Sequence, residues 1–251
     1  MKKAMLFVSF GSSYESARKN NIDKTVNIVA QEYKDYDVFQ AYTSNMIRRK
    51  LKNQGIDIDS VSEALTKIKD SGYTDVIIVS LHIIAGFEYE KILKVTKDFN
   101  FDSCKLTTAM LHEERDYHDV ALLLDTLYKD LEHPIVLMGH GSEHKNDISY
   151  DRLQEELDKI DSKKYYIATV EGKTTIEDIV IKLKNNGEDS VYLTPFMLVC
   201  GDHANNDMAG EEDDSWKNIL KSQNIVAKLI LKGLGAVSYT HLRAHETVLD
   251  L

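Results

Sequence analysis

Two histidines and one glutamate could together hold a divalent metal ion. His140 and Glu171 come directly after the short apolar runs Ile135–Gly139 and Tyr165–Val170, and His203 lies in the loop after a third run. If these runs are parallel strands of one sheet, their carboxyl ends share an edge, where ligands usually bind. Two imidazoles and a carboxylate, with positions left for water or substrate, are a common ligand set for transition metals. The pattern therefore predicts a metal site, although each residue taken singly also suits an ordinary loop position.

Two other segments could bind an anionic ligand. Gly11-Ser12-Ser13 precedes a predicted helix and could cradle an anion at the amino end of that helix. It is not a P-loop, which needs Gly-Lys-Ser/Thr. Arg48-Arg49-Lys50 is a basic cluster that could attract a polyanion, or simply form a solvated helix face. The chain has no Gly-x-Gly-x-x-Gly and no Gly-x-Ser-x-Gly, so neither a dinucleotide site nor a serine-hydrolase site is expected.

The elements that must position these residues alternate along the chain. Apolar runs rich in Val, Ile, Leu and aromatic residues do not alternate polar with apolar, which is typical of parallel strands covered on both faces. The predicted strands are Ala4–Phe10, Asp37–Tyr42, Asp75–Leu81, Lys105–Ala109, Ile135–Gly139, Tyr165–Val170, Ser190–Thr194 and Ile225–Leu229. Apolar residues at three- and four-residue spacing predict helices over Tyr14–Tyr33, Val61–Ser71, Tyr89–Phe99, Asp116–Leu131, Ser149–Ile160, Ile176–Asn186 and Ser215–Gln223. This alternation predicts a parallel α/β fold.

The sequence also contains an internal repeat. Ile68–Gly86 aligns without a gap on Leu183–Gly201, and Ser9–Ser12 aligns on Gly139–Ser142. The first half is longer, with the extra residues expected around Ser44–Ser60. Self-similarity on this scale predicts two copies of one α/β unit. We therefore expect two similar Rossmann- or flavodoxin-like lobes, residues 1–133 and 134–235, with a ligand cleft between the carboxyl ends of their parallel sheets.

The two predicted lobes differ where chemistry is expected. Phe10 stands where the second lobe has His140, and Glu88 stands where it has His203. His82 lies among apolar residues, so it is as consistent with a hydrogen-bonded core histidine as with a functional one. We therefore assign the metal ligands to the second lobe, and regard Glu88 as the better-placed polar residue of the first.

Composition excludes several classes of partner. The 251 residues include 31 basic and 41 acidic side chains, and a net charge of −10 argues against non-specific binding to nucleic acid or to anionic membranes. No apolar run approaches the roughly 20 residues of a membrane span, and Met1–Phe10 fits a buried strand better than a signal peptide. Two cysteines are too few for a disulfide scaffold. We expect a cytoplasmic protein, and the oligomeric state, a homo-oligomer included, stays open.

Several longer motifs are more specific than these patterns. They are Val8–Tyr14, Ala41–Leu51, Ser80–Ile84, Gly86, Glu88–Glu90, Met138–Gly141, Leu198–Ala204, Asn206–Ala209 and Asp214–Lys217. In these segments the chain resembles the sirohydrochlorin cobaltochelatases of anaerobic cobalamin biosynthesis, collinearly from Met1 to about Gly235. The resemblance implies a chelatase-like fold, related to that of ferrochelatases, in which two similar α/β lobes enclose a tetrapyrrole cleft.

The resemblance also implies an activity and a set of site residues. The expected enzyme is a lyase that inserts Co²⁺, its substrate metal, into sirohydrochlorin without an organic cofactor. The family's metal ligands and catalytic histidine correspond to His140, Glu171 and His203, although only Val170-Glu171 fits the motif around the glutamate. Metal insertion must remove two pyrrole protons, and a neutral imidazole can accept a proton or hold a metal. Our hypothesis is that His140 is the principal base, while His203 and Glu171 help to hold the ion.

Recognition of the tetrapyrrole is expected to use the first lobe. Its ring carboxylates need cationic or N–H partners, for which Ser12, Ser13, Arg48 and Arg49 are the candidates. The other residues expected at the substrate site are Phe10, His82 and Glu88.

Two alternatives stay open at this point. Iron or nickel could replace cobalt on a related ring, because histidine and carboxylate ligands do not by themselves select among these metals. A non-catalytic protein that binds a tetrapyrrole or a metal is the other alternative. The lack of a clear signal peptide and the asymmetric set of base and ligands weigh against it.

The last residues do not continue the family pattern. Ala236–Leu251 includes His241, His245 and Glu246, whose spacing suggests metal ligands. This segment instead looks like translated adapter or vector sequence, so we predict no metal site there. We expect the natural protein to be longer and to end in a closing helix.

Overall fold

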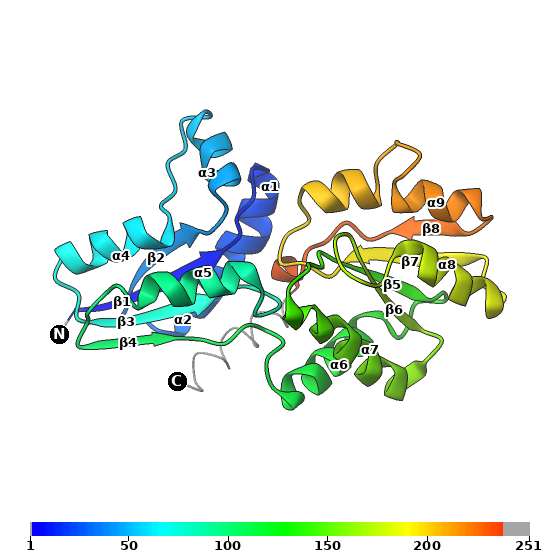
Figure 1. Ribbon diagram of the computed structural model, residues 1–251, viewed down its shortest axis with the longest axis horizontal. Helices are drawn as coiled ribbons and strands as arrows, with labels where there is room; N and C mark the ends of the chain where they lie inside the picture. The colour runs from blue at the N-terminus through cyan, green and yellow to red at the C-terminus, as the bar shows by residue number, and fades with distance from the viewer. Residues whose placement is uncertain (1, 238–251) are drawn as a thin grey trace. The chain divides into compact units, whose positions relative to one another are not determined.

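The computed structural model describes residues 2–237, which form two compact α/β units (Figure 1). Unit 1 contains the chain up to Leu111 and the segment that begins at Gly235, and unit 2 is His112–Leu234. Each unit contains a sheet of four strands, and every strand pairing is parallel. The predicted parallel α/β class is therefore confirmed.

In unit 1 the strand order is β2-β1-β3-β4. The strands are β1 (Lys3–Ser9), β2 (Asp37–Tyr42), β3 (Asp75–Ser80) and β4 (Ser103–Leu106). Ser9 pairs with Tyr42, and Val8 pairs with Ser80. The carboxyl ends of three adjacent strands therefore lie at one edge of the sheet.

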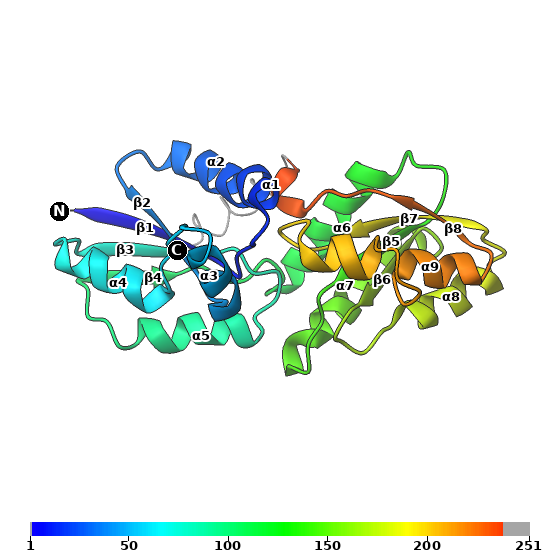
Figure 2. The same cartoon turned by 90° about the horizontal axis from the view of Figure 1, so that it is seen from above.

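Helices cover both faces of this sheet. They are α1 (Glu15–Ala17), a π-helix (Arg18–Asp23), α2 (Lys24–Glu32), α3 (Asn45–Lys52), α4 (Val61–Asp70) and α5 (Phe87–Thr96). Figure 2 shows α1 and α2 on one side of the sheet and α4 and α5 on the other. Buried side chains such as Leu65 of α4 and Ile92 of α5 share a core cluster with Leu6 and Ile78 of the sheet. Burial of this apolar surface is the main force that holds the helices on the sheet.

In unit 2 the strand order is β6-β5-β7-β8, which matches unit 1 strand for strand. The strands are β5 (Ile135–Gly139), β6 (Tyr165–Thr169), β7 (Ser190–Pro195) and β8 (Val226–Leu229). The helices are α6 (Glu114–Tyr128), a 3₁₀ turn (Lys145–Asp147), α7 (Ile148–Asp161), α8 (Ile176–Asn185), a π-helix (Ala204–Met208) and α9 (Trp216–Ser222). A 3₁₀ turn (Leu234–Ala236) links the end of unit 2 to the returning segment of unit 1.

The backbone confirms the repeat seen in the sequence. Gly72 and Gly187 follow α4 and α8, and their φ angles are 79° and 76°. Gly11 and Gly141 follow β1 and β5, and their φ angles are 95° and 74°. Left-handed backbone of this kind favours glycine, which explains why these residues anchor the alignment of the two halves.

The division between the units differs from the predicted one at 133/134. Helix α6 packs against α7, where the Tyr117 hydroxyl lies 3.1 Å from Ser149 Oγ. The Tyr165 hydroxyl also donates to Asp125 of α6 at 2.7 Å. These contacts place α6 in unit 2, so the division falls between Leu111 and His112.

The second unit ends at Leu234, one residue before the predicted end. The chain returns to unit 1 at Gly235, whose backbone packs so closely on Asn21 that an added Cβ would lie 2.8 Å from the Asn21 carbonyl oxygen. Lys24 Nζ donates to the carbonyl oxygen of Ala236 at 2.8 Å.

Two local elements were not predicted. Helix α3 begins at Asn45, because Ser44 Oγ accepts the backbone N–H of Ile47 at 3.3 Å and caps the helix. It lies inside the segment where the insertion was expected. The predicted helix Tyr14–Tyr33 contains the π-helix Arg18–Asp23.

The remaining predictions concern the membrane and the tail. No helix in residues 2–237 combines the length and apolar character needed for a membrane span. Most of the Ala236–Leu251 tail, including His241, His245 and Glu246, lies outside the described residues.

Candidate metal site

Three loops of unit 2 bring the predicted metal ligands to one sheet edge. His140 follows β5, Glu171 follows β6, and His203 lies between β7 and the π-helix Ala204–Met208. The Glu171 N–H donates to the His140 carbonyl oxygen at 2.8 Å, which continues the pairing of β5 with β6. The rings of His140 and His203 meet edge to face, with centroids 4.7 Å apart. The structure therefore brings all three residues to one sheet edge, with the two imidazoles in contact and Glu171 beside His140.

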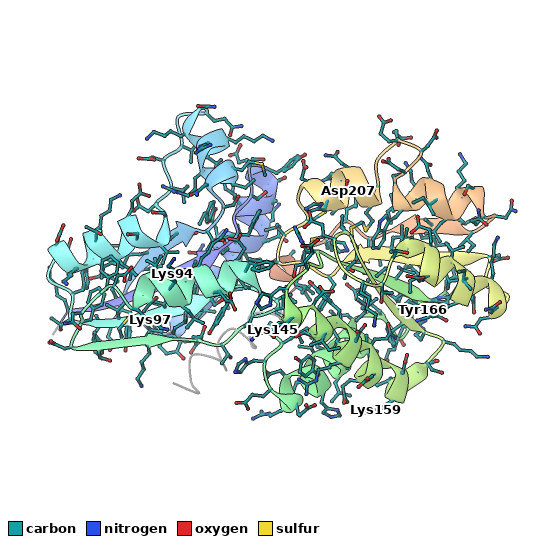
Figure 3. The ribbon with its side chains drawn as sticks, in the orientation of Figure 1. Lys94, Lys97, Lys145, Lys159, Tyr166 and Asp207 are labelled. Atoms are coloured by element: carbon teal, nitrogen blue, oxygen red, sulfur yellow. The ribbon has the colours of Figure 1, made fainter. Side chains whose placement is uncertain are left out.

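Hydrogen bonds define how each imidazole is oriented. His140 Nδ1 lies 2.8 Å from the carbonyl oxygen of Gly141, which can only accept. His203 Nδ1 lies 2.5 Å from the carboxylate Oδ2 of Asp207, which Figure 3 labels on its π-helix. In a neutral ring whose Nδ1 carries the proton, the lone pair is on Nε2. Both histidines therefore have the tautomer in which Nε2 can bind a metal or accept a proton.

Asp207 lies within the Asn206–Ala209 motif, but no role was predicted for it. It follows His203 by four residues, a spacing that brings two side chains to one side of a helical turn. A carboxylate on the far nitrogen of a histidine is the usual partner of a metal-binding imidazole. That spacing was the signal that could have identified Asp207.

The three side chains are partly exposed and do not surround a common ion position. The side chains of His140, Glu171 and His203 are 39%, 58% and 32% exposed. Glu171 Oε2 lies 3.8 Å from His140 Nδ1, the nitrogen that faces away from the metal-binding position. In residues 2–237, no three His, Cys, Asp or Glu side chains converge closely enough to hold an ion as they stand. Glu171 would have to rotate to join the two imidazoles on one ion.

Glycines allow the His140 and Glu171 loops to touch. A Cβ at Gly141 would lie 2.4 Å from the backbone nitrogen of Gly172 and 2.7 Å from Thr169 Cβ. Because φ at Gly141 is also positive, both space and backbone conformation require glycine there. The close backbone approach fixes the two loops relative to one another.

In unit 1, local hydrogen bonds hold the predicted anion-binding loop, Gly11-Ser12-Ser13. Ser12 is buried, and its Oγ accepts the Tyr14 N–H at 3.2 Å, while Ser13 is half-buried. Arg18 donates from one terminal nitrogen to the carbonyl oxygens of Ser12 and Ser13, at 3.3 and 3.1 Å. Arg18 was not predicted, and it adds a cation directly beside this loop. Phe10, at the start of the loop, is 39% exposed.

The basic cluster divides into two kinds of residue. Arg48 is engaged within unit 1, because its Nε donates to the Ile58 carbonyl oxygen at 2.9 Å and its guanidinium pairs with Glu63. Its other contact is to Asn45 Oδ1 at 3.3 Å. Arg49 is exposed. Arg48 therefore stabilises the connection between α3 and α4, and Arg49 is the more accessible cation.

His82 lies in the loop after β3, close enough to Glu88 in the first turn of α5 to feel its charge. Ser80 Oγ lies 3.1 Å from His82 Nδ1. Burial lowers the pKa of His82 to about 4, although the nearby charge of Glu88 opposes this shift. Within the described chain, His82 Nε2 and Glu88 Oε2 are buried without a hydrogen-bond partner. His82 is therefore half-buried, with one nitrogen beside Ser80 Oγ and the other buried without a partner.

Known proteins are similar to this chain over nearly its whole length. The sequence pattern of the cobalt chelatase (CbiK) family matches residues 3–243. Sirohydrochlorin cobaltochelatase from Salmonella typhimurium is 38% identical over 242 residues, which are 94% of this chain and 90% of that protein. Sirohydrochlorin cobaltochelatase CbiKC from Nitratidesulfovibrio vulgaris is 30% identical over 262 residues, with coverage of 99% and 92%.

Solved structures agree on the fold. SirB from Bacillus subtilis with Fe³⁺ matches with a TM-score of 0.67 at 15% identity, covering 100% of this chain and 95% of that one. CbiX, described as the terminal enzyme for biosynthesis of siroheme in denitrifying bacteria, matches with a TM-score of 0.61 at 12% identity and 98% coverage of both chains. At these identities the likeness concerns the fold alone, and it supports the chelatase-like architecture.

Proposed function

The chain belongs to the cobalt chelatase (CbiK) family, and on that premise we propose that it is a lyase that inserts Co²⁺ into sirohydrochlorin. The observation that supports this best is the pair of imidazoles, His140 and His203, whose rings lie 4.7 Å apart beside Glu171. Such a set can hold a divalent ion briefly and also accept protons.

Metal insertion has a simple balance of atoms. Co²⁺ exchanges its water and protein ligands for four ring nitrogens, and two pyrrole N–H groups lose their protons. We assign the first proton to Nε2 of His140, since Nδ1 of that ring donates to the Gly141 carbonyl oxygen, and the second proton to solvent water. His203 and Glu171 hold the entering ion. Because Glu171 is exposed and must rotate toward the imidazoles, the ligand set can also open to release the metal to the ring.

Asp207 supports this role of His203. Its carboxylate accepts from His203 Nδ1, which keeps the proton on that nitrogen and leaves the lone pair on Nε2. A negative charge on the far side of the ring also makes Nε2 a stronger ligand. The pair therefore strengthens His203 as a metal ligand.

We assign recognition of the ring to unit 1. The polyanionic substrate needs local cations, because the protein carries a net charge of −10. Arg49 and the Ser12–Ser13 loop, now with Arg18, are proposed to face ring carboxylates. Phe10 offers an exposed aromatic surface for the macrocycle. The other proposed substrate residues are Arg48, through its support of the α3 region, and His82 and Glu88.

The decisive experiment is a metal-insertion assay. Purified protein is mixed with sirohydrochlorin and with Co²⁺, Fe²⁺ or Ni²⁺ in turn, and the change in ring absorbance is compared with an enzyme-free control. We expect acceleration with Co²⁺ and its loss in His140→Ala, provided that the variant is folded by circular dichroism. Faster insertion of iron or nickel would replace cobalt as the assigned metal. No acceleration with any metal would favour a protein that binds without turnover.

We also propose a cytoplasmic setting. Cys104 and Cys200 are free thiols, as expected in a reducing compartment. Burial raises the pKa of both thiols, so neither is activated as a nucleophile. Fractionation of cells that produce the natural protein tests this setting, and recovery with the periplasmic fraction would contradict it.

A further inference from the structure

We propose that Asp147 is a positioning residue that holds the His140 loop (residues 140–147) and the Glu171 loop (residues 170–175) in register, so that both ligands serve one ion. This inference rests on the proposed function. It concerns a side chain at the start of α7 that accepts a backbone N–H from each loop.

The Asp147 carboxylate accepts one backbone N–H from each loop. Asp147 Oδ1 accepts the backbone N–H of Ser142 at 2.9 Å, and Ser142 lies two residues beyond His140. Asp147 Oδ2 accepts the backbone N–H of Lys173 at 3.4 Å, and Lys173 lies two residues beyond Glu171. The carboxylate therefore bridges the two loops, in each case two residues after the proposed ligand.

The use of Asp147 is unusual for its position. An aspartate at the start of a helix ordinarily accepts an N–H of its own first turn. The Asp147 side chain makes no such bond with α7. Its backbone N–H donates to the His144 carbonyl oxygen at 2.9 Å, which holds the residue within the 3₁₀ turn. Its two oxygens are thus committed to the neighbouring loops instead of to its own helix.

The Glu171 loop leaves space for this carboxylate. A Cβ at Gly172 would lie 2.6 Å from Asp147 Oδ2 and 2.5 Å from Thr169 Oγ1. The φ angle of Gly172 lies outside the left-handed range that favours glycine, so space rather than backbone conformation favours glycine there. Any larger residue would push Asp147 from its place between the loops.

Loss of this bridge should affect the metal more than the ring. Without it, the loops keep the direct bond from the Glu171 N–H to the His140 carbonyl oxygen, but Ser142 and Lys173 lose their shared acceptor. Supporting partners of metal ligands typically alter affinity by about 10- to 100-fold. The residues proposed to bind the tetrapyrrole belong to unit 1, so its KM should change little.

The test compares Asp147→Ala and Asp147→Asn with Asp151→Asn as the matched control. Asp151 lies one helical turn further along α7, and its carboxylate is 3.8 Å from Lys173 Nζ. Apo-protein is titrated with Co²⁺ alone and followed by the visible absorption of the bound ion. Initial rates are then measured with Co²⁺ and sirohydrochlorin varied separately.

We expect Asp147→Ala to weaken Co²⁺ binding at least tenfold, to change the spectrum of bound Co²⁺, and to leave the KM for sirohydrochlorin within twofold. Asp147→Asn keeps one acceptor oxygen and should fall between Asp147→Ala and wild type. Asp151→Asn should stay within twofold of wild type. Unchanged Co²⁺ affinity in folded Asp147→Ala, or an equal loss in Asp151→Asn, would overturn the proposal.

A second route protects the test against a variant that does not fold. Gly172→Ala displaces the Asp147 carboxylate without removing it, and should reproduce the loss of Co²⁺ affinity. If Gly172→Ala and Asp147→Asn both bind Co²⁺ like wild type, the positioning role is wrong. The Co²⁺ titration is independent of turnover, so a wild-type protein that binds Co²⁺ without inserting it would refute the proposed function while still deciding the role of Asp147.

Discussion

Asp207→Asn should weaken Co²⁺ binding while leaving the fold intact. The change keeps the size of the side chain and one acceptor oxygen, but removes the negative charge that faces His203 Nδ1 at 2.5 Å. Asparagine can also present its NH₂ group to the ring, which would favour the wrong tautomer of His203. Either effect lowers the ability of Nε2 to bind a metal.

The magnitude follows from the exposure of the pair. A hydrogen bond to a charged group contributes about 1.5–3 kcal/mol when it is well protected. The side chains of His203 and Asp207 are 32% and 45% exposed, so solvent screening reduces this contribution. We therefore expect about 1–2 kcal/mol, which at about 1.4 kcal/mol per factor of ten corresponds to roughly a 5- to 30-fold rise in the Kd for Co²⁺.

The assay is a Co²⁺ titration of apo-protein, with steady-state insertion rates measured alongside. The matched control is Asp202→Asn, which removes the same charge one residue before His203, where the carboxylate accepts from Asn206 Nδ2 at 3.1 Å. We expect the KM for Co²⁺ to rise in Asp207→Asn and the rate at saturating Co²⁺ to fall less, since the ion must leave His203 during insertion. If the two variants lost the same amount of Co²⁺ affinity, the negative charge alone, and not the contact with Nδ1, would determine binding. If neither lost affinity, Asp207 would have no role in binding.

Three further predictions concern other residues. The pKa of His82 is about 4 in the fold against 6.5 for an ordinary histidine, so only the unfolded chain gains a proton as pH falls through that window. The free energy of unfolding should therefore decrease as the pH falls from about 6.5 to about 4. His82→Gln should remove up to about 3 kcal/mol of that decrease, measured by urea titration at each pH. The same pH dependence in His82→Gln and wild type would contradict this. Arg18→Gln should raise the KM for sirohydrochlorin about two- to fivefold without changing the KM for Co²⁺, whereas Arg48→Gln should chiefly lower the melting temperature. If Arg18→Gln changed the KM for sirohydrochlorin and the KM for Co²⁺ equally, the assignment of Arg18 to the ring would be wrong. Gly141→Ala should lower the free energy of unfolding in urea by about 2–4 kcal/mol. Gly55 also has a positive φ but open space around it, so Gly55→Ala should lower it less. Similar losses of stability in the two variants would exclude a steric cause at Gly141.

The parallel sheets could be predicted because each strand is a continuous apolar run and the two halves repeat. Helix α3 escaped prediction because its short stretch is mostly polar and depends on the Ser44 cap. The position of α6 depends on its packing against α7, which no local pattern records. The same is true of the site. The proposed ligands could be found from their places after strands, and the four-residue spacing from His203 could have indicated Asp207. Asp147 could not be found in this way, because the chain brings it to Lys173 only by folding.

The duplicated backbone explains why the proposed metal ligands lie in one unit. The Ser44 N–H donates to the Phe10 carbonyl oxygen at 3.4 Å, as the Glu171 N–H donates to that of His140 at 2.8 Å. Ser44 therefore occupies the place of Glu171, but its side chain is committed to capping α3. Unit 1 therefore shares the backbone arrangement but has Phe10 and Ser44 where unit 2 has His140 and Glu171.

This equivalence supplies a replacement that the fold already accommodates. His140→Phe copies the residue that unit 1 uses at the same point, before a glycine with a similar positive φ. We expect its melting temperature to stay within a few degrees of wild type. The insertion rate should fall at least about 100-fold, the usual effect of losing a general base, and Co²⁺ binding should weaken as well. His118→Phe, which replaces an exposed histidine of α6, is the control. A folded His140→Phe that retained more than about a tenth of the wild-type rate would show that the proton is accepted elsewhere.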